Sequence, residues 1–339
     1  MKTVVLQEPG EFRMIQTQAP GAPAQDEALV RVRRIGICGT DMHAYRGRQP
    51  FFTYPRILGH ELGVEVLEVG PNEQGLRPGD RCALEPGLYC GRCNACRHGR
   101  TNCCRHLKLL GVHIDGGMRE LLKVPVTHLH RSEKLGLEQL ALVETLSIGC
   151  HAIDRARIEP HEPTLVIGVG PIGLTVVQFA KLAGADVIVM DTNERRLEFC
   201  RDVLGVEKTL VAGTPDLPGR LETVCGGELP TLVLDATGNA KSMTAASDLV
   251  ACAGRLVLVG IVQDRISFDD PEFHRREITI LASRNSRPRD FDRIIDLLEQ
   301  EKINTTPWIT HRATFEDMID QFETWIDPES GTIKPVVEV

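Results

Sequence analysis

The sequence predicts an α/β protein with a mostly β first part and a second part built on a parallel sheet covered by helices. Its 339 residues exceed the usual size of one domain, roughly 100–200 residues. Short strand-like segments separated by many Gly and Pro fill the chain up to about residue 125. From Thr164 onward, runs that are apolar throughout alternate with helical patterns, which is typical of strands buried on both faces.

The first part is expected to be an antiparallel β region that carries functional loops. Residues 4–6 and 28–32 are apolar strand segments separated by Pro and Gly. Residues 64–69 alternate apolar and acidic side chains, and Gly70 then interrupts the pattern.

The second part predicts a series of buried parallel strands. The first apolar run is followed by a helical pattern at 171–183. The runs lie at 165–167, 187–190, 232–234, 256–259 and 278–282. After this sheet, an amphipathic helix is expected over about 291–301, and from Ile309 the chain returns to short strands and one helix. We expect one domain to comprise 1–150 and the returning segment 286–339, and the other to comprise 151–285.

The composition excludes several classes of protein. The chain has 39 Lys and Arg against 47 Asp and Glu, a net charge of −8, so it lacks the cations that a nucleic-acid backbone requires. It contains no apolar run of the 18 or so residues that span a bilayer. The N-terminus has no signal-peptide core. We therefore expect a cytoplasmic protein that binds a small molecule.

A dinucleotide site is predicted where the first apolar run meets the first helix. Gly168, Gly170 and Gly173 form a GxGxxG there. The first Gly permits the tight turn, the second lets the backbone approach a pyrophosphate, and the third allows close packing of helix on strand. Asp191 ends the next apolar run, as the Rossmann fingerprint requires. Glycines in an unrelated turn are the alternative.

The identity of the dinucleotide depends on Asp191. Its carboxylate would accept hydrogen bonds from the adenosine ribose and would repel a 2′-phosphate, which favours NAD over NADP. Arg195 and Arg196 lie close enough in sequence to leave NADP open.

A cysteine cluster predicts a metal site. The chain has 11 cysteines, an odd number, and five of them fall within 90–104. Four thiolates suit tetrahedral zinc and leave no open position, so such a metal would be structural. The proposed ligands are Cys90, Cys93, Cys96 and Cys104, with Cys103 a rival for the fourth position. The alternatives are reduced thiols without metal and, less compatible with the spacing, an iron–sulfur centre.

Cys38, His60 and Glu61 form a second candidate. One thiolate, one imidazole and one carboxylate leave a position open for water or substrate, as catalytic zinc requires. Asp41 is placed to orient the imidazole. The alternative is an ordinary His–Glu pair with no metal.

Several segments together resemble the zinc-dependent medium-chain dehydrogenases over nearly the whole chain. They are GICGTDMHAY, YPRILGHE, the Cys90–Cys104 loop, VETLSIGCHA and GVGPIG, in the family's order. The chain looks closest to the branch of sorbitol, L-threonine and L-galactonate dehydrogenases. The segments 99–104, GVHIDGG, DPEFHRRE and SRN look most like the L-galactonate oxidoreductase type. The resemblance implies a Rossmann doubly wound sheet plus a mostly β, GroES-like catalytic domain.

The resemblance also implies roles for single residues. Cys38, His60 and Glu61 match the catalytic-zinc positions, and the structural-zinc loop matches Cys104 rather than Cys103. Glu144 matches a glutamate that ligates the catalytic zinc or holds its water in different members. Thr40 and His43 match a proton relay. The positions that line the NAD site are Ile172, Asp191, Arg196, Val259, Gly260, Ile261, Ser283 and Arg284; in this family Arg196 is compatible with NAD.

Two departures from the family pattern concern glycine and proline. The family usually has Gly three residues after the Glu of GHE; here Val64 stands there and Gly63 precedes it. Thr145 follows Glu144, where the family commonly has Pro.

The expected function is oxidation of a secondary hydroxyl of a polyol or sugar acid to a ketone by a zinc-dependent, NAD(P)-linked homodimer or homotetramer. Zinc would activate the hydroxyl, hydride would pass to the nicotinamide, and the proton would leave through Thr40, a ribose hydroxyl of the cofactor and His43. Segments that line the pocket in similar proteins contain Tyr45, Arg46, Arg48, Phe51, Phe52 and His113. The arginines are candidates for binding a carboxylate; a solvated loop is the alternative. Rival functions are a sorbitol or L-threonine 3-dehydrogenase activity, a zinc-free quinone reductase and a zinc-ribbon interaction module.

Overall fold

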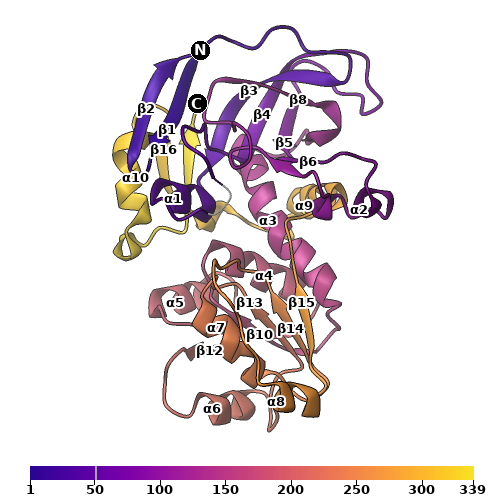
Figure 1. The fold of residues 1–339 in the computed structure, drawn as a ribbon, viewed down its shortest axis with the longest axis vertical. Helices are drawn as coiled ribbons and strands as arrows, with labels where there is room; N and C mark the ends of the chain where they lie inside the picture. Colours follow the sequence, from indigo (N-terminus) through magenta and orange to yellow (C-terminus); the bar gives the residue numbers. More distant parts are fainter. Residues whose placement is uncertain (50–51) are drawn as a thin grey trace. The chain divides into compact units, whose positions relative to one another are not determined.

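The computed structural model describes residues 1–49 and 52–339, which divide into two compact units (Figure 1). Unit 1 comprises Met1–Thr145 and Arg287–Val339, and unit 2 comprises Leu146–Ser286. The sequence had suggested boundaries at 150 and 285. Phe51, one of the suggested pocket residues, lies outside the described residues.

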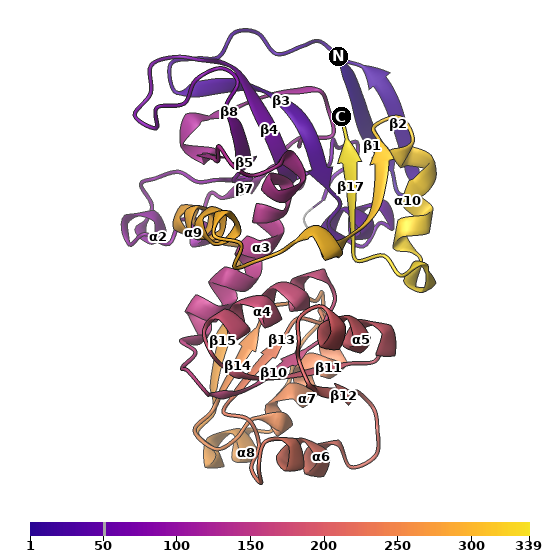
Figure 2. The ribbon, with the colours of Figure 1, turned by 180° about the vertical axis from the view of Figure 1, so that it is seen from behind.

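Unit 1 is built on a seven-stranded sheet. Its strand order is β16 (Ile309–Thr314), β17 (Lys334–Glu338), β3 (Glu27–Gly36), β4 (Glu61–Val69), β5 (Arg81–Leu84) and β9 (Leu129–Arg131), and β8 (Leu121–Pro125) also pairs with β3. All pairs are antiparallel except β16 with β17. The C-terminal strand therefore lies directly beside β3, as Figure 2 shows from behind.

Smaller elements complete unit 1. They are β1 (Lys2–Glu8) paired with β2 (Glu11–Gln16), β6 (Gly87–Leu88) paired with β7 (Lys108–Leu109), and helices α1 (Gly39–Tyr45), α2 (Asn94–Arg97), α9 (Pro288–Glu299) and α10 (Met318–Ile326). The core combines alternate side chains of β3, such as Val30 and Val32, with Phe322 and Trp325 of α10. The predicted β region and the returning helices are thus confirmed.

Unit 2 is a six-stranded parallel sheet with helices. The strand order is β12 (Lys208–Val211), β11 (Asp186–Asp191), β10 (Pro163–Ile167), β13 (Leu232–Asp235), β14 (Arg255–Leu258) and β15 (Thr279–Ala282). The helices are α4 (Pro171–Leu182), α5 (Glu194–Asp202), α6 (Leu217–Val224), α7 (Ala240–Ala245) and α8 (Asp270–Arg275). This order, 3-2-1-4-5-6 in chain order, is that of dinucleotide-binding sheets, so the predicted fold class is confirmed.

Short 3₁₀ helices occur at Thr101–Cys103, Val126–His128, Ala246–Leu249, Thr306–Trp308 and Pro328–Ser330.

The elements that were not predicted include the long helix α3 (Leu137–Ala156) and the strand β12. Helix α3 is apolar or small at most of its positions and buried along most of its length, so its sequence lacks the apolar–polar contrast of an amphipathic helix. It also contains Gly149, where an added Cβ would lie 2.4 Å from Thr175 Oγ1. Strand β12 has four residues at the edge of the sheet, too short for a clear pattern.

The fold explains why Gly stands at position 63, one residue before the position where the family usually has it. A Cβ at Gly63 would lie 2.2 Å from the carbonyl oxygen of Leu137 and 3.3 Å from the amide nitrogen of Ala141. The backbone of β4 therefore runs directly against the first turn of α3, immediately after His60 and Glu61. A side chain at this position would push apart the strand and the helix.

We expect Gly63→Ala to destabilise the protein by about 1–3 kcal/mol, because backbone atoms cannot move aside as a flexible side chain can. Gly70→Ala, directly after the same strand, is the matched control, since its added Cβ would meet only the carbonyl oxygen of Gln25, at 3.6 Å. Thermal unfolding of both variants measures the effect. Equal melting temperatures for the two variants would contradict this account of the strand–helix contact.

Candidate active site

The Cys38 loop is fixed by the start of helix α1. Cys38 is the N-cap residue, and the carboxylate of Asp41 accepts a hydrogen bond from its backbone N–H at 3.0 Å. Asp41 is completely buried. This reciprocal cap sets the direction of the Cys38 thiol at the end of β3.

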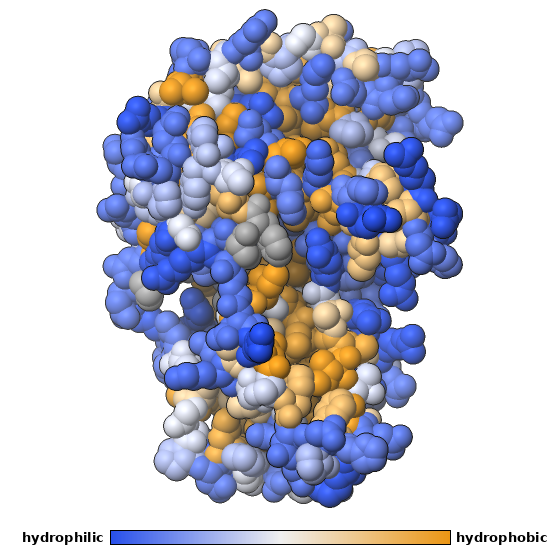
Figure 3. Space-filling view, viewed as in Figure 1, coloured by the Kyte–Doolittle hydropathy of each residue, from blue (hydrophilic) through white to orange (hydrophobic). Residues whose placement is uncertain are grey.

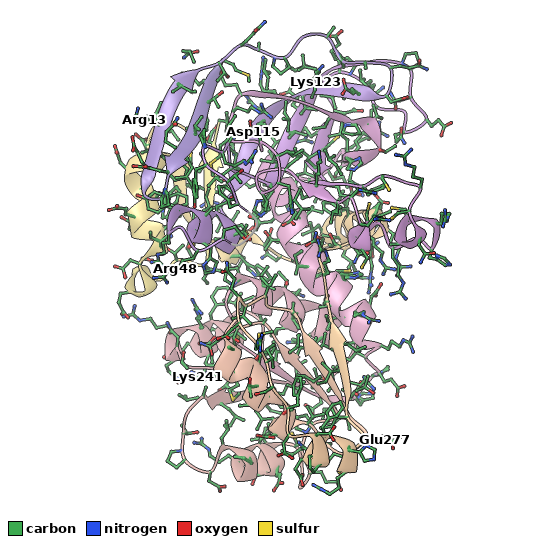
Figure 4. The ribbon with its side chains drawn as sticks, in the orientation of Figure 1. Arg13, Arg48, Asp115, Lys123, Lys241 and Glu277 are labelled. Atoms are coloured by element: carbon green, nitrogen blue, oxygen red, sulfur yellow. The ribbon has the colours of Figure 1, made fainter. Side chains whose placement is uncertain are left out.

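The loop that carries His60 is supported from behind by the segment 115–118. The amides of Gly116, Gly117 and Met118 donate to the carbonyls of residues 57, 59 and 58, at 2.8–2.9 Å. Asp115 Oδ1 accepts from Ile57 N at 3.2 Å; the Asp115 side chain is labelled in Figure 4. A Cβ at Gly116 would lie 2.3 Å from Gly59 O. The GVHIDGG segment thus holds the backbone that presents His60.

These two loops bring the predicted ligands together. One ligand atom from each of Cys38, His60 and Glu61 lies within 4.8 Å of the others. His60 Nδ1 is buried without a hydrogen-bond partner among the described residues and lies 3.6 Å from Asp41 Oδ1. Although burial disfavours the imidazolium, the charges of Asp41 and Cys38 raise the pKa of His60 well above its usual value. This anionic, buried set fits a divalent cation.

A residue that the sequence did not indicate, Lys334, completes the cluster. Its Nζ lies 2.7 and 2.8 Å from the two carboxylate oxygens of Glu61 and donates to Ile37 O at 3.2 Å. Lys334 is only 1% exposed. Burial would raise the pKa of Glu61, but Lys334 and then His60 hold it below its usual value. The only available signal was a lone lysine before an apolar C-terminal strand.

Gly36 provides the space that the carboxylate of Glu61 occupies. It ends β3 opposite Glu61, and a Cβ there would lie 2.2 Å from Glu61 Oε2.

Glu144 comes from the unit 1 end of α3 and interacts electrostatically with the same cluster. Burial raises its pKa to about 7, and Glu61 adds to this effect while His60 opposes it. A buried carboxyl group with a raised pKa beside a potential metal site is a candidate for a functional role.

The predicted relay residues lie on α1, three positions apart, and hence on the same side of the helix. Thr40 is partly buried and His43 is exposed. Although the residue as a whole is exposed, desolvation of its ring lowers the pKa of His43, and the positive charges of Arg46 and Arg48 add to this effect. The imidazole is therefore neutral at pH 7 and able to accept a proton.

The remaining pocket candidates do not all converge. Arg46 Nη2 donates to Ile326 O at 2.6 Å, and Tyr45 donates its hydroxyl hydrogen to Glu323, so both hold α10. His113 Nδ1 accepts from Leu109 N at 3.1 Å, and Phe52 packs on Tyr54. Arg48 extends from the end of α1 (Figure 4).

The four cysteines of the second cluster also converge, with their sulfur atoms within 4.8 Å of one another. Cys104 Sγ accepts from the amides of Cys90 and His106, at 3.4 and 3.3 Å. Backbone amides of Cys96 and Arg105 lower the pKa of Cys93 to about 6, which favours the thiolate. Cys103 is exposed and lies outside the group. The closed tetrad fits tetrahedral zinc.

In unit 2, the glycine fingerprint adopts the geometry that a dinucleotide site needs. Gly168 has φ +81°, and a Cβ at Gly173 would lie 1.8 Å from Gly168 O. Gly170 caps α4, and Ile172 lies in its first turn. The N-terminus of this helix is thereby open to an anion.

Asp191 ends β11 beside this turn. Its Oδ2 accepts from Val169 N at 2.7 Å and its Oδ1 from Asn193 N at 2.8 Å, so it also fixes the glycine turn. Arg196 Nη1 lies 3.8 Å from Asp191 Oδ2.

A second turn, absent from the sequence prediction, lies at the end of β13. Buried Asp235 accepts hydrogen bonds from Thr237 and Ser242 through its side chain. Its carbonyl accepts from the amides of Val259 and Gly260, and a Cβ at Gly260 would lie 2.4 Å from Gly238 N. Ile261, 70% exposed, follows. The polar segment DATGN was the available signal.

Ser283 and Arg284 follow β15, with Ser283 N donating to Leu258 O at 2.9 Å. The buried Ser283 hydroxyl has no partner among the described residues.

Comparisons with known proteins agree with these sites. Residues 24–134 match the alcohol dehydrogenase GroES-like domain, and residues 171–300 match the zinc-binding dehydrogenase model. L-galactonate-5-dehydrogenase of Escherichia coli (strain K12) is 39% identical over 337 residues, covering 99% of this chain and 98% of the relative.

Two solved structures are similar in fold and hold a nicotinamide dinucleotide. The alcohol dehydrogenase rspB of E. coli CFT073, with NADH, has a TM-score of 0.93 and 30% identity, covering 100% and 99% of the two chains. A zinc-binding dehydrogenase of Sinorhizobium meliloti 1021, bound to NADP, has a TM-score of 0.90 and 29% identity, with the same coverage.

The chain belongs to the zinc-dependent alcohol dehydrogenase family and is an oxidoreductase. The predictions of family and enzyme class are thus confirmed. Among the described residues, none of the helices has the length and apolar character to cross a membrane.

We expect Lys334→Met to destabilise the protein by about 3–5 kcal/mol, because it leaves the buried Glu61 carboxylate without its counter-charge. The pair contributes stability above the ordinary pKa of Glu, and this contribution is lost as pH falls through the lowered pKa of Glu61. The deficit of the variant should therefore shrink on acidification. Urea unfolding across pH measures it, with exposed Lys302→Met as control. A deficit equal to that of the control would contradict the role of Lys334.

Proposed function

We propose that this protein oxidises a secondary hydroxyl of a polyol or sugar acid, L-galactonate-like, to a ketone with NAD. The observation that carries the proposal is the buried set of Cys38, His60 and Glu61, which presents mixed sulfur, nitrogen and oxygen ligands beside Glu144. The sequence similarity to an L-galactonate-5-dehydrogenase supports the substrate class. Sorbitol or L-threonine 3-dehydrogenase activity is the alternative.

Cys38, His60 and Glu61 would hold the catalytic zinc, and Cys90, Cys93, Cys96 and Cys104 a structural one. Zinc at the first site supplies a Lewis acid that lowers the pKa of a substrate hydroxyl, and NAD at the fingerprint of unit 2 supplies the hydride acceptor. Glu144 contributes a further ligand or accepts a hydrogen bond from a water molecule.

The residues of α1 and β17 have separate tasks. Thr40 Oγ1 accepts the proton of the substrate hydroxyl and passes its own proton on toward His43. The imidazole of His43, kept neutral by partial burial and the neighbouring arginines, releases the proton to solvent. Lys334 fixes the orientation of Glu61. Asp41 lies beside His60 Nδ1 and orients the imidazole.

Arg48 is our candidate for the substrate carboxylate. Both arginines are exposed; Arg46 Nη2 donates to the Ile326 carbonyl, and Arg48 lies three residues after the end of α1. Arginine binds carboxylates in bidentate geometry, which suits an aldonate substrate.

We further propose a homodimer or homotetramer in the cytoplasm; the eleven free cysteines are compatible with a reducing compartment.

A substrate panel tests the proposal. L-galactonate and other aldonates, sorbitol and other polyols, and L-threonine are assayed for NADH formation, with wild type compared to Arg48→Gln. We expect the highest kcat/KM for an aldonate and a selective loss of aldonate turnover, relative to polyols, in the variant. Preference for L-threonine or a neutral polyol would overturn the sugar-acid assignment.

The two metal sites should respond differently to substitution. Cys38→Ser is expected to abolish activity with little change in melting temperature, because an open site contributes little to folding. Cys96→Ser should lower the melting temperature and solubility first, since a closed tetrahedral site contributes directly to folding. Zinc analysis should fall from two per chain to one in each variant. An unchanged melting temperature and two zinc ions in Cys96→Ser would refute the structural site.

Asp191 should determine cofactor preference. Asp191→Gly removes the ribose acceptor and the charge that repels a 2′-phosphate, so the NADP-to-NAD ratio of kcat/KM should rise about tenfold or more. The variant also loses the acceptors of Val169 N and Asn193 N, so a modest loss of stability is expected. Asp186→Gly, on the same strand, is the control. A wild-type preference for NADP would contradict this reading.

The proton relay predicts a pH-dependent effect. His43→Ala should slow alcohol oxidation by about 100-fold or less, because solvent substitutes in part at an exposed relay end, and the loss should be greatest at low pH. Because the pKa of His43 is lowered, wild type should keep its neutral base below the usual pKa of histidine. Thr40→Ala should be slower than Thr40→Ser, which retains a hydroxyl. Identical pH–rate profiles for wild type and His43→Ala would exclude the relay.

A further inference from the structure

The segment 86–114 forms an exposed, strongly basic lobe on an acidic protein. It contains α2, β6 and β7 and carries no Asp or Glu. Its five cations are all exposed, and none makes an ion pair among the described residues: Arg92, Arg97, Arg100, Arg105 and Lys108. The protein as a whole has a net charge of −8. The four clustered thiolates with one zinc ion would offset two of these five charges, so the lobe keeps an excess of positive charge, which an anionic partner relieves.

The segment 313–333, which contains α10, has the opposite character. It carries six carboxylates and no Lys, Arg or His. They are Glu316, Asp317, Asp320, Glu323, Asp327 and Glu329, all exposed. Asp317, Asp320 and Glu323 follow one another at a spacing of three and so share one side of the helix, where like charges disfavour the helix. Glu316 pairs with Lys2, but Asp320, Asp327 and Glu329 make no ion pair among the described residues.

The two segments belong to the same unit but lie at its opposite ends. Figures 1 and 2 show α2 and α10 on either side of the seven-stranded sheet. Hydrophilic side chains cover most of the surface at both ends in the view of Figure 3. The lobe therefore lies too far from α10 of its own chain to neutralise its charge. It can neutralise α10 of another copy, because each copy carries one basic lobe and one acidic α10 segment.

We propose that the basic lobe, residues 86–114, docks on the acidic α10 segment, residues 313–333, of a second copy of this chain. The contact joins different surfaces of the two copies, and a two-fold arrangement forms it twice. Complementary charges set the partner and the association rate more than they set the affinity, so the contact is sensitive to salt. A polyanion such as nucleic acid is the alternative anionic partner, and the test below distinguishes it from a second copy.

Charge reversal tests the proposal independently of catalysis. The lobe variant is Arg100→Glu with Lys108→Glu, and the α10 variant is Asp320→Lys with Glu329→Lys; none of these four side chains makes an ion pair with a residue that the structure describes. The control for the lobe variant, with the same change in net charge, is Arg220→Glu with Lys241→Glu in unit 2, where Lys241 lies on α7 (Figure 4). Sedimentation velocity at about 0.05 M and about 0.5 M salt measures association, since screening lengths shorten several-fold over this range.

We expect wild type and the control to associate at low salt and to lose this association step at high salt. Each reversal variant should weaken the low-salt step by about tenfold or more. A 1:1 mixture of the two variants should restore it, because each then offers the charge that the other lacks. Zinc content and melting temperature establish that each variant is folded, and the mixture gives a gain of association that misfolding cannot produce.

Three results would overturn the proposal: a wild type without salt-sensitive association, reversal variants that associate like the control, or a mixture that fails to restore the step. Lobe-dependent binding of RNA or of phosphatidylserine vesicles, with association unchanged in the lobe variant, would assign the lobe to a different anion and would also overturn it.

Discussion

The buried ion pair between Lys334 and Glu61 is the interaction on which unit 1 depends. It joins residues 273 positions apart and links the last strand of the chain, which lies beside β3, to β4 on the other edge of β3. Glu61 retains its charge in the interior only because Lys334 contacts both of its oxygens. Gly36 of β3 leaves room for the carboxylate of Glu61, and Gly63 lets strand β4 lie against α3. The same ion pair therefore fixes the C-terminal strand and orients a carboxylate of the candidate metal site.

The site follows from this arrangement. Once β4 is fixed between β3 and α3, His60 and Glu61 emerge beside the capped loop of Cys38, and Glu144 approaches from α3. Carboxylates, a thiol and an imidazole in a buried space give a negative potential that a divalent cation neutralises. In unit 2, one residue also has two roles. Asp191 fixes the glycine turn through its hydrogen bonds and lies where a ribose would bind.

Features that depend on local spacing could be predicted from the sequence. The glycines of residues 168–173 and the cysteines of residues 90–104 lie close in sequence, so the turn and the tetrad are encoded in short segments. The grouping of Cys38 with His60 was a hypothesis from ligand chemistry that the resemblance supported, because only the register of β3 with β4 brings the two residues together. Lys334 could not be found, since nothing in a five-residue apolar strand identifies the carboxylate it meets. Helix α3 could not be predicted either, because a helix that is buried on most sides lacks the alternation of apolar and polar faces that identifies an amphipathic helix.

Anomalous diffraction at the zinc absorption edge, on crystals of the purified protein, tests the account most directly. The account predicts one peak among Cys38, His60 and Glu61 and a second peak among Cys90, Cys93, Cys96 and Cys104. A fully zinc-loaded protein with no peak at coordination distance from His60, or with density showing Glu61 turned away from Lys334, would contradict it.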